Sequence, residues 1–513
     1  MKMRTALLCS LSALALAATT AVAQPGVPMT PYVSVPLVST PVVVPPKFQG
    51  GFHEELTLNL PAGWGVQVFQ GNALQRPRFL TWGPDSVLYV ADISGRILAL
   101  PDKNPRDGVA DDAIVAANEV FAHDIKFYNG SLYAAEQTRV LQLTDTDGDG
   151  VYEKRSVFID NIPGGGGHVT RTIVFDSLNQ KLYLSIGSSC NVCREDDRAI
   201  IEQYNIDGTG RRTYATGVRN AVGMTLHPRT NQLWATNNGH DNQGNDIPPE
   251  WIDIVRENGF YGWPFAYGVQ VYNDFTRPGG YSALLPITAA DSTRVRTMVP
   301  PGALVQAHSA LMAMEFPNTT AFPEEYRGGA FVVSRGSWNR QPAAGYKVMY
   351  LGFANDQDTI ADNVSDFLTG FLTDSIAGTN WGRPVGLESD SRGNLYLTLD
   401  DGRPSVLFIS RNQSMGVENG AGGNAASPGL SDVYPNPTSN VAVVRFTLPE
   451  AAPVTLALLD LNGRAVRTVV KDRHTEAGEG SIDFSTADLP AGVYLYRLTA
   501  GGTSETGRVV VVR

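Results

Sequence analysis

One histidine of the chain stands where a side chain could act as a base. His168 follows the run Pro163-Gly-Gly-Gly-Gly and precedes Val169-Thr-Arg-Thr-Ile-Val-Phe, so a flexible loop leads into a strand there. A neutral imidazole can take a proton from a substrate hydroxyl near neutral pH. His168 is therefore a candidate general base, and a solvated loop histidine is the other interpretation of this context.

Three arginines share the same kind of position. Arg219 and Arg383 open repeats, in Gly-Val-Arg219-Asn220-Ala-Val-Gly and in Gly-Arg383-Pro, and Arg335 lies near the end of a strand run. If these three guanidinium groups lie together at one opening of the protein, they would suit an anionic ligand, because each can bind a carboxylate through two N–H groups. Separate surface ion pairs are the alternative.

A run of acidic residues has the spacing of a calcium loop. Asp145, Asp147 and Asp149 occupy positions one, three and five, and Gly150 occupies position six. Position twelve is Ser156 instead of glutamate, so the loop is not a full EF-hand. We expect a structural calcium site completed by Glu153, with an Asp-Gly turn as the alternative. The segment Asp102–Asp111 is a weaker relative.

Two cysteines remain once a leader containing Cys9 is removed. Cys190 and Cys193 are separated by two residues, and a redox-active pair at this spacing would need a thioredoxin-like βαβ context that the sequence lacks. In an exported protein we expect a structural disulfide in a loop.

Several function classes are excluded. The chain has 51 acidic against 40 basic residues, a net charge of −11, so we expect no nucleic-acid partner. The sequence contains no zinc-type histidine pair, no Gly-x-Ser-x-Gly elbow, no P-loop and no dinucleotide-binding glycine motif.

Short strands must position these residues. The 52 glycines and 32 prolines favour many turns, and a pattern of alternating strands joined by turns recurs six times. The repeats span Phe79–Leu100, Ile125–Leu143, Thr172–Tyr204, Val222–Val255, Ala310–Leu351 and Val385–Ser410. We predict an all-β protein, a six-bladed β-propeller followed by a small C-terminal β-sandwich, in place of unrelated hairpins.

The chain divides into five segments. We expect a signal peptide (1–23), a proline-rich linker (24–50), the propeller (51–414), a flexible linker (415–429) and the sandwich (430–513). No stretch is long and apolar enough for a transmembrane segment.

The motifs of residues 65–411 resemble those of soluble quinoprotein dehydrogenases, specifically the sorbosone dehydrogenase-like branch of the glucose and aldose dehydrogenase group. The matching motifs are Gly-Gly-His168-Val-Thr-Arg-Thr-Ile, Gly187-Ser-Ser-Cys-Asn-Val-Cys193, Tyr214-Ala-Thr-Gly-Val-Arg-Asn-Ala-Val-Gly, Leu233-Trp-Ala-Thr-Asn-Asn-Gly-His-Asp, Pro248-Pro-Glu, Tyr261-Gly-Trp-Pro, Gly336-Ser-Trp-Asn-Arg and Gly382-Arg-Pro-Val.

This resemblance implies a propeller that holds pyrroloquinoline quinone and Ca²⁺ in its mouth. It makes His168 the base, with Arg219 and Asn220 at the reactive side of the quinone. It also implies that the main-chain carbonyls of Gly239 and His240 bind calcium and that Arg335 and Arg383 face the cofactor's carboxylates. Glucose-oxidising members orient the histidine with an aspartate, and here Ser188 and Ser189 follow the strand instead.

The C-terminal segment resembles the sorting domain of type IX secretion cargo. The resemblance rests on Asp432-Val-Tyr-Pro-Asn-Pro, Leu459-Asp-Leu-Asn-Gly-Arg and Leu489-Pro-Ala-Gly-Val-Tyr. It implies the type IX machinery as a partner and a secreted or cell-surface location; an adhesion-like module is the alternative.

These features together predict a dehydrogenase of an aldose, a sorbosone-like aldehyde or a polyol, with a separate electron acceptor. The alternatives are a non-catalytic cell-surface propeller that binds glycans or proteins, and a calcium-dependent lactonase-type hydrolase. The arginine set distinguishes them, because a polyanionic cofactor needs it and a glycan binder would prefer exposed aromatic side chains.

Overall fold

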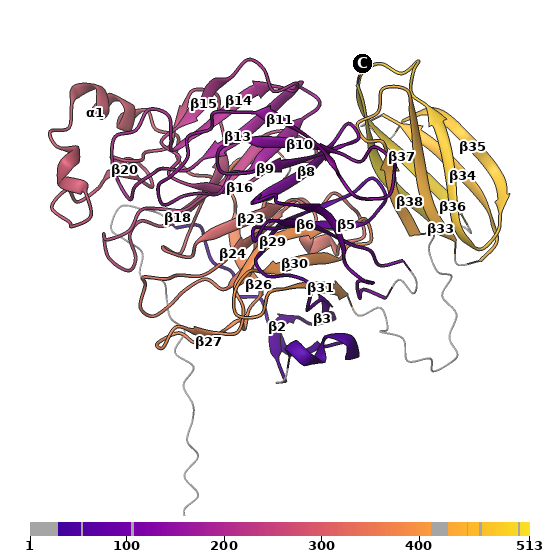
Figure 1. Ribbon diagram of the computed structural model, residues 1–513, viewed down its shortest axis with the longest axis horizontal. Helices are drawn as coiled ribbons and strands as arrows, with labels where there is room; N and C mark the ends of the chain where they lie inside the picture. The colour runs from indigo at the N-terminus through magenta and orange to yellow at the C-terminus, as the bar shows by residue number, and fades with distance from the viewer. Residues whose placement is uncertain are drawn as a thin grey trace, which may run out of the picture.

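The protein is described by a computed structural model that covers residues 29–52, 55–103, 107–355, 357–411, 429–448, 450–460, 464–500 and 503–512. The predicted signal peptide and nearly all of the predicted linker 415–429 lie outside these ranges. The regular elements of the described chain are almost all β-strands (Figure 1), which confirms the all-β prediction.

Six mainly antiparallel sheets follow one another along the chain. The first contains β4 (Pro77–Trp82), β5 (Leu88–Asp92), β6 (Arg96–Leu100) and β7 (Ile114–Asn118). The second contains β8 (Asp124–Tyr128), β9 (Ser131–Ala135), β10 (Val140–Thr144) and β11 (Lys154–Ile159). The third contains β12 (Ile173–Asp176), β13 (Lys181–Ile186), β14 (Ile200–Asn205), β15 (Arg212–Thr216) and the short β19 (Gly259–Phe260).

The other three sheets repeat this order. The fourth contains β16 (Ala221–Leu226), β17 (Leu233–Asn237), β18 (Glu250–Ile254) and β22 (Ala303–Val305). The fifth contains β23 (Leu311–Glu315), β24 (Ala330–Ser334), β25 (Lys347–Gly352) and β26 (Asn363–Leu368). The sixth contains β29 (Pro384–Ser389), β30 (Leu395–Leu399), β31 (Ser405–Arg411), β3 (Trp64–Gln70), β1 (Leu37–Val43) and β2 (Thr57–Pro61).

The first strands of the six sheets contact one another in a closed cycle, in the order β4, β8, β12, β16, β23, β29 and β4 again. Each predicted repeat lies within one sheet and covers its first three strands. The six sheets therefore form a ring, and all the first strands lie at its centre.

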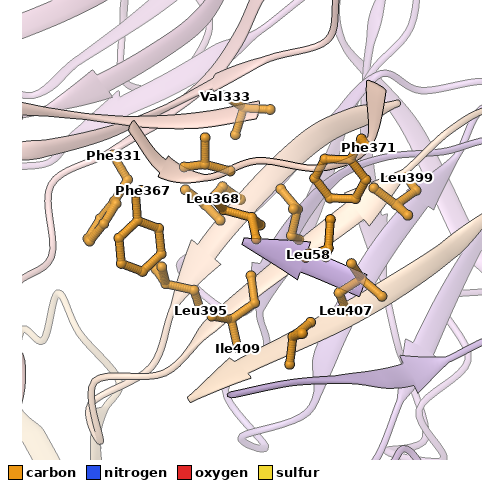
Figure 2. Close-up of a cluster of buried hydrophobic side chains, with 14 of the residues drawn as sticks. Leu58, Phe331, Val333, Phe367, Leu368, Phe371, Leu395, Leu399, Leu407 and Ile409 are labelled. Carbon is orange, nitrogen blue, oxygen red and sulfur yellow. The ribbon is translucent and has the colours of Figure 1, made fainter. Parts of the chain in front are cut away.

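The core of the ring is divided among the seams between neighbouring sheets. In β5, Tyr89 and Ala91 pack toward the second sheet, and Leu88 and Val90 pack toward the sixth sheet. A strand that is covered on both faces needs apolar side chains at successive positions, which explains why its sequence is apolar throughout. The seam between the fifth and sixth sheets is shown in Figure 2, where phenylalanine and leucine side chains of the two sheets meet.

The sixth sheet joins the two ends of the ring. Strand β3 pairs with β31, so that Trp64 lies opposite Arg411, and on its other side β3 pairs with β1. Residues 46–51 form the 3-10 helix η1 (Pro46–Gly51). The prediction of an unpacked linker over 24–50 is therefore wrong for Leu37–Val43 and for Pro46–Gly51, because β1 lies between β2 and β3 in the sixth sheet and Val42 and Phe48 are buried.

An excursion between β18 and β22 packs outside the ring. It contains β20 (Ala266–Tyr267), β21 (Val271–Tyr272), the 3-10 helix η2 (Tyr281–Leu284) and the helix α1 (Ala289–Arg296). The remaining small elements are η3 (Glu324–Tyr326), β27 (Leu372–Asp374) and β28 (Thr379–Asn380). The side chains of Thr288 and Asp291 form a capping box at the start of α1.

The C-terminal segment forms two sheets of its own. One contains β32 (Gly429–Tyr434), β33 (Val441–Leu448) and β36 (Gly478–Ser485), and the other contains β34 (Ala452–Leu459), β35 (Ala465–Thr475), β37 (Gly492–Ala500) and β38 (Thr503–Val511). Side chains of both sheets share one buried cluster, which contains no residue of the ring. Among the described residues, no helix is both long and apolar enough to cross a membrane.

Candidate active site

A cavity of about 670 Å³ lies at one end of the ring. Its lining comes from chain segments just before the first strands, such as Arg219 and Asn220, and just after the second strands, such as Asn238 and Asp400. In each sheet the first and second strands are antiparallel. The start of the first strand and the end of the second strand therefore lie at the same end of the sheet. The ring therefore gathers residues that are far apart in the sequence at one opening.

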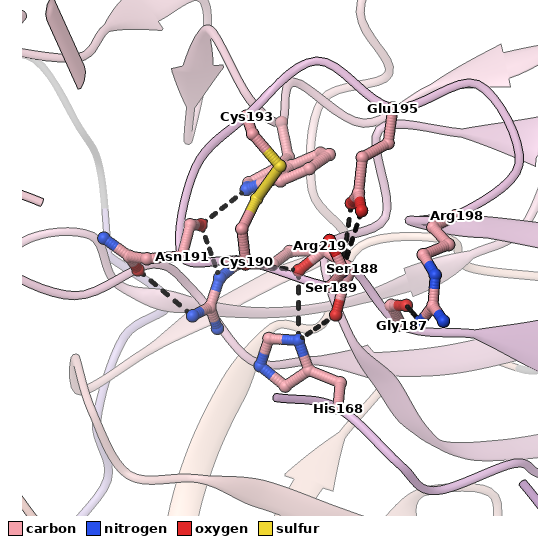
Figure 3. The surroundings of a disulfide bond; sticks show 11 residues. His168, Gly187, Ser188, Ser189, Cys190, Asn191, Cys193, Glu195, Arg198 and Arg219 are labelled. Atoms are coloured by element: carbon pink, nitrogen blue, oxygen red, sulfur yellow. Dashed lines mark hydrogen bonds between the residues drawn. A yellow bond between two sulfur atoms is a disulfide. The ribbon is translucent and has the colours of Figure 1, made fainter. Parts of the chain in front are cut away.

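The predicted base His168 lies in this lining, just before β12. Its Nδ1 lies 2.7 Å from the main-chain oxygen of Ser188 and 3.0 Å from the Ser188 hydroxyl, which itself donates to the carbonyl of Cys190 (Figure 3). A carbonyl oxygen can only accept, so Nδ1 carries the hydrogen. Nε2 is therefore left as the proton acceptor.

The surroundings of His168 keep its ring neutral. Burial and then the positive charge of Arg219 lower the pKa of His168 to about 4, against the raising effect of the Ser188 carbonyl. Arg171 and Arg198 contribute in the same direction as Arg219. These two arginines also donate to main-chain carbonyls of the glycine-rich loop, at Pro163 and Gly164. The imidazole is therefore a base that stays unprotonated in mildly acidic solution.

Arg219 is buried in the same lining and is fixed by several hydrogen bonds. Its guanidinium donates to the main-chain oxygen of Asn191 (3.1 Å), to the side-chain oxygen of Asn191 (3.1 Å), to the carbonyl of Gly239 (2.6 Å) and to the carboxylate of Asp241 (3.2 Å). These contacts leave the group little freedom to move. It therefore adds a fixed positive charge to the cavity.

A second group of arginines also lines the cavity. Arg78 and Arg335 pair with the buried carboxylate of Asp400, Arg335 at 2.9 Å, and Arg76 lies in the same lining, where its charge acts on Arg78. Burial lowers the pKa of Arg78 to about 10, so it stays charged at neutral pH. Three cations and one anion leave a net charge of two positive units on this wall. Such a wall suits a ligand with several carboxylates.

Arg383 has a different environment from the one we predicted. It is absent from the described cavity lining, and its guanidinium donates to the carbonyls of Arg335, Gly336 and Ser337. Its charged group also lies 5.1 Å from the centre of the Tyr346 ring. The guanidinium of Arg383 thus supports the main chain of the loop that carries Arg335. Its predicted role toward the cofactor's carboxylates stays a prediction.

Sequence reasoning missed Arg76, Arg78 and the carboxylates of Asp241 and Asp400. A signal for Arg76 existed, because Arg76-Pro77 opens the first sheet just as Arg383-Pro384 opens the sixth. The sequence reasoning used the second of these two motifs alone. No comparable pattern marks the two aspartates.

Three residues of the cavity lining carry unpartnered side-chain oxygen atoms. Among the described residues, the side-chain oxygens of Asn220, Asn238 and Asn339 are buried without a hydrogen-bond donor, and all three residues line the cavity. Gly239 and Asp241 add a carbonyl and a carboxylate to the same lining. Oxygen donors of this kind suit a hard cation such as calcium. The lining thus fits a divalent cation as well as an anionic ligand.

His240 lies behind this lining. It is buried, its Nδ1 lies 2.7 Å from the Tyr281 hydroxyl, and burial followed by the charge of Arg219 lowers its pKa to about 3. The ring is therefore neutral and serves the packing of the excursion. The predicted role of its main-chain carbonyl stays a prediction.

The predicted calcium loop lies apart from the cavity, between β10 and β11. Carboxylate oxygens of Asp145, Asp147 and Asp149 lie within 4.8 Å of one another. Glu153 instead accepts hydrogen bonds from the main chain and hydroxyl of Thr146. The three aspartates are thus gathered as we expected, without the fourth carboxylate. In the weaker relative, Asp102 accepts from the main chain of Asp107 and Gly108.

Cys190 and Cys193 are joined by a disulfide bond (Figure 3). Cys190 and Asn191 line the cavity beside His168. The bond therefore lies at the candidate site, although the sequence reasoning assigned it no part in the chemistry.

Three comparisons relate the chain to known proteins. Residues 58–412 match the TrAA12-like family, and residues 432–512 match a secretion system C-terminal sorting domain. A pyrroloquinoline quinone-dependent pyranose dehydrogenase of Coprinopsis cinerea is 27% identical over 297 residues, which is 48% of this chain and 40% of that protein. The alignment thus spans about two fifths of the relative's length.

Solved structures share the fold of the ring. A Trichoderma reesei structure of carbohydrate-active enzyme family AA12 has a TM-score of 0.59 at 19% identity and covers 69% of this chain and 97% of its own. The holo form of the pyranose dehydrogenase PQQ domain from Coprinopsis cinerea has a TM-score of 0.56 at 22% identity and covers 74% of this chain and all of its own.

Proposed function

Because the chain belongs to the TrAA12-like family, we propose that it is an exported dehydrogenase that uses pyrroloquinoline quinone and calcium. Its substrate would be an aldose, a sorbosone-like aldehyde or a polyol. The ring of six sheets would be a six-bladed propeller, and the two C-terminal sheets a sorting β-sandwich. The observation that carries this proposal is that a neutral histidine and a cluster of arginines line the same cavity.

The arginines would hold the cofactor. Arg76, Arg78 and Arg335 carry more positive charge than Asp400 neutralises, so they can pair with the cofactor's carboxylates. The unpartnered oxygens of Asn220 and Asn238 would accept a cation or a ligand donor. When bound, pyrroloquinoline quinone supplies the acceptor for a hydride, and calcium polarises its carbonyl.

His168 would move the proton. Nδ1 is committed to the Ser188 carbonyl, so Nε2 takes the hydroxyl proton of the substrate. Arg219 is fixed beside it and stabilises negative charge that develops on the substrate oxygen. The enzyme then needs an external electron acceptor for the next turnover.

A second function is favoured by one residue. Trp338 lines the cavity and is 76% exposed, and exposed aromatic rings are typical of glycan-binding surfaces. A non-catalytic propeller that binds glycans would use this ring without needing the arginines. The lactonase-type alternative has no such support, because a net cationic wall is not required for hydrolysis.

The test is reconstitution of the purified full chain. Pyrroloquinoline quinone is titrated with Ca²⁺ present or with Ca²⁺ chelated, and the absorbance of the bound quinone is followed. We expect saturable, calcium-dependent binding and reduction of an artificial electron acceptor by aldoses. His168→Gln is the matched variant, which should bind the quinone and turn over slowly. A chain that binds oligosaccharides but no quinone would establish the glycan-binding function instead.

A further inference from the structure

The loop closed by the Cys190–Cys193 disulfide contacts both proposed functional side chains (Figure 3). We propose that this loop is the positioning element of the active site, with Ser188 and Asn191 as its positioning residues. Ser188 fixes the tautomer of His168, and Asn191 fixes the guanidinium of Arg219. The inference rests on the proposed function, because it concerns the same site.

Ser188 links the side chain of His168 to the main chain of Arg219. Its carbonyl accepts from Nδ1 of His168 at 2.7 Å, and its N–H donates to the main-chain carbonyl of Arg219 at 2.8 Å. The hydroxyl donates to Cys190 at 2.7 Å, so it accepts from His168. Both acceptors for Nδ1 thus belong to one residue that is anchored to a half-cystine.

Asn191 lies between the cysteines and uses its main chain and side chain together. Its main-chain oxygen accepts from Arg219 at 3.1 Å and from the indole of Trp263 at 3.0 Å. Its side-chain oxygen accepts from Arg219 and from the main chain of Asp241, at 2.7 Å in the second case. Its amide donates to the Asp241 carbonyl at 3.1 Å. One residue therefore sets the positions of Arg219 and Asp241.

The loop depends on cross-links because it has no regular structure. Residues 187–199, between β13 and β14, form no strand or helix. The disulfide holds the loop, and so does the hydrogen bond that the main-chain N–H of Ser189 donates to the carboxylate of Glu195. The ion pair between Arg194 and Asp291 of α1, at 2.8 Å, attaches the loop to the excursion. A cross-link limits the conformations that such a segment can adopt. Loss of the disulfide should therefore loosen Ser188 and Asn191 together.

The first test measures the tautomer of His168 without turnover. The protein is labelled with ¹⁵N-histidine, its ring signals are recorded by NMR, and His168→Gln assigns the signal of interest. We expect hydrogen on Nδ1 and none on Nε2. A water-soluble phosphine then cleaves the S–S bond: two electrons from phosphorus and two protons give two thiols, and the phosphine takes oxygen from water.

Reduction should turn the single His168 tautomer into a mixture of the two tautomers. The number of free thiols is counted by mass after alkylation. An unchanged His168 signal with both thiols free would overturn the proposal.

The second test uses kinetics of the quinone-loaded enzyme. Asn191→Ala should lower kcat on the order of 10-fold to 100-fold with a smaller change in KM, because the reacting groups are misplaced. Asn191→Asp keeps the side-chain acceptor and should recover part of the loss. Cys190→Ser/Cys193→Ser should lower kcat as Asn191→Ala does. Leu98→Ala, a core variant in β6, is the control that lowers Tm and leaves kcat unchanged.

The outcomes separate the two proposals. If the native chain neither binds quinone nor turns over, the proposed function fails, and the tautomer measurement still decides whether the loop orients His168. If the native chain is active and the Asn191 and cysteine variants keep its kcat, the positioning role fails and the proposed function stands.

Discussion

His168 is a weak base that remains available over a wide pH range. Burial and the charges of Arg219, Arg171 and Arg198 all disfavour its protonated form, and the pKa near 4 reflects their sum against the Ser188 carbonyl. The same charges reduce its basicity.

Replacing His168 with glutamine tests its chemical role. The amide of the introduced side chain can still donate to the Ser188 carbonyl but cannot take a proton, so kcat should fall on the order of 10² to 10⁴. Quinone affinity should change little, because the arginines that would hold the cofactor are untouched. Rates come from an artificial-acceptor assay and affinity from an absorbance titration. An unchanged rate would remove the assignment of His168 as the base.

The pH profile of kcat/KM tests the electrostatics of the same residue. A base acts in its unprotonated form, so activity is retained above the folded pKa and lost below it. Because the pKa of His168 is lowered to about 4, the acid limb should lie near pH 4 and not near pH 6.5. Arg198→Gln removes one of the cations and should move the limb to higher pH. A limb near pH 6.5 in the native enzyme would contradict this account.

Arg335 and Arg383 form a matched pair of variants. Arg335 lines the cavity, whereas Arg383 donates to the main-chain carbonyls of the loop that carries Arg335. Arg335→Ala should weaken quinone binding by about 10-fold or more, since a charge-assisted pair is lost. Arg383→Ala should weaken binding less and lower Tm, as its carbonyl partners lose their donor. Equal losses of affinity, measured by titration, would mean that Arg383 also faces the ligand.

The candidate site could be predicted in part from the sequence. His168, Arg219 and Arg335 were identified from their places in the repeats, and the ring brings them to one cavity. The contribution of Ser188 could not be predicted, because its carbonyl is the main acceptor and any residue type supplies a carbonyl. The position of Arg383 depends on the path of the loop after β24, which no local pattern determines.

At the scale of elements, the inner three strands of each sheet were predictable and the outer strand was not. The inner strands are buried on both faces, as in β5 and β17, and their apolar runs are clear in the sequence. The outer strand β11 is mostly exposed, and β22 has three residues. Exposure removes the apolar pattern on which strand prediction depends. The outer strand β3 of the sixth sheet comes from the other end of the ring sequence.

The acidic loop between β10 and β11 gives a test at this scale. The carboxylates of Asp145, Asp147 and Asp149 repel one another unless a cation neutralises them. Calcium should therefore raise Tm independently of the quinone, chelation should lower it, and Asp147→Ala should remove most of this dependence. Thermal denaturation with and without chelator measures the effect. Identical curves would show that the loop is only a turn stabilised by its main-chain hydrogen bonds.

At the scale of the whole molecule, the ring and the C-terminal sheets have separate cores. No ring residue belongs to the buried cluster of the C-terminal sheets, and Arg508 reaches the ring through a hydrogen bond to the carbonyl of Pro228 at 2.6 Å. Each part therefore buries its apolar side chains without the other. The sequence predicted this division from the composition of the segment between them, although not the contact itself.

Ending the chain at Asn419 tests the division. Strand β31 ends at Arg411, so the shortened chain keeps all six sheets and should keep the Tm of the ring and its quinone binding. Export should fail in a host with the type IX system, because the sorting domain is missing. Circular dichroism and cell fractionation measure the two properties. Normal secretion would refute the sorting role, and loss of folding would show that the two parts depend on each other.

The pairing of β3 with β31 also determines when the ring can form. Trp64 pairs with Arg411, so the closing contact joins nearly the two ends of the ring sequence. The entropy cost of closing such a long loop falls on a late step of folding, after the intervening sheets have been synthesised. Until then, one edge of β3 has no partner and can pair with another chain. A pause in synthesis before Ser405, where β31 begins, therefore leaves a nascent chain that is prone to aggregate, and completion of β31 ends that exposure.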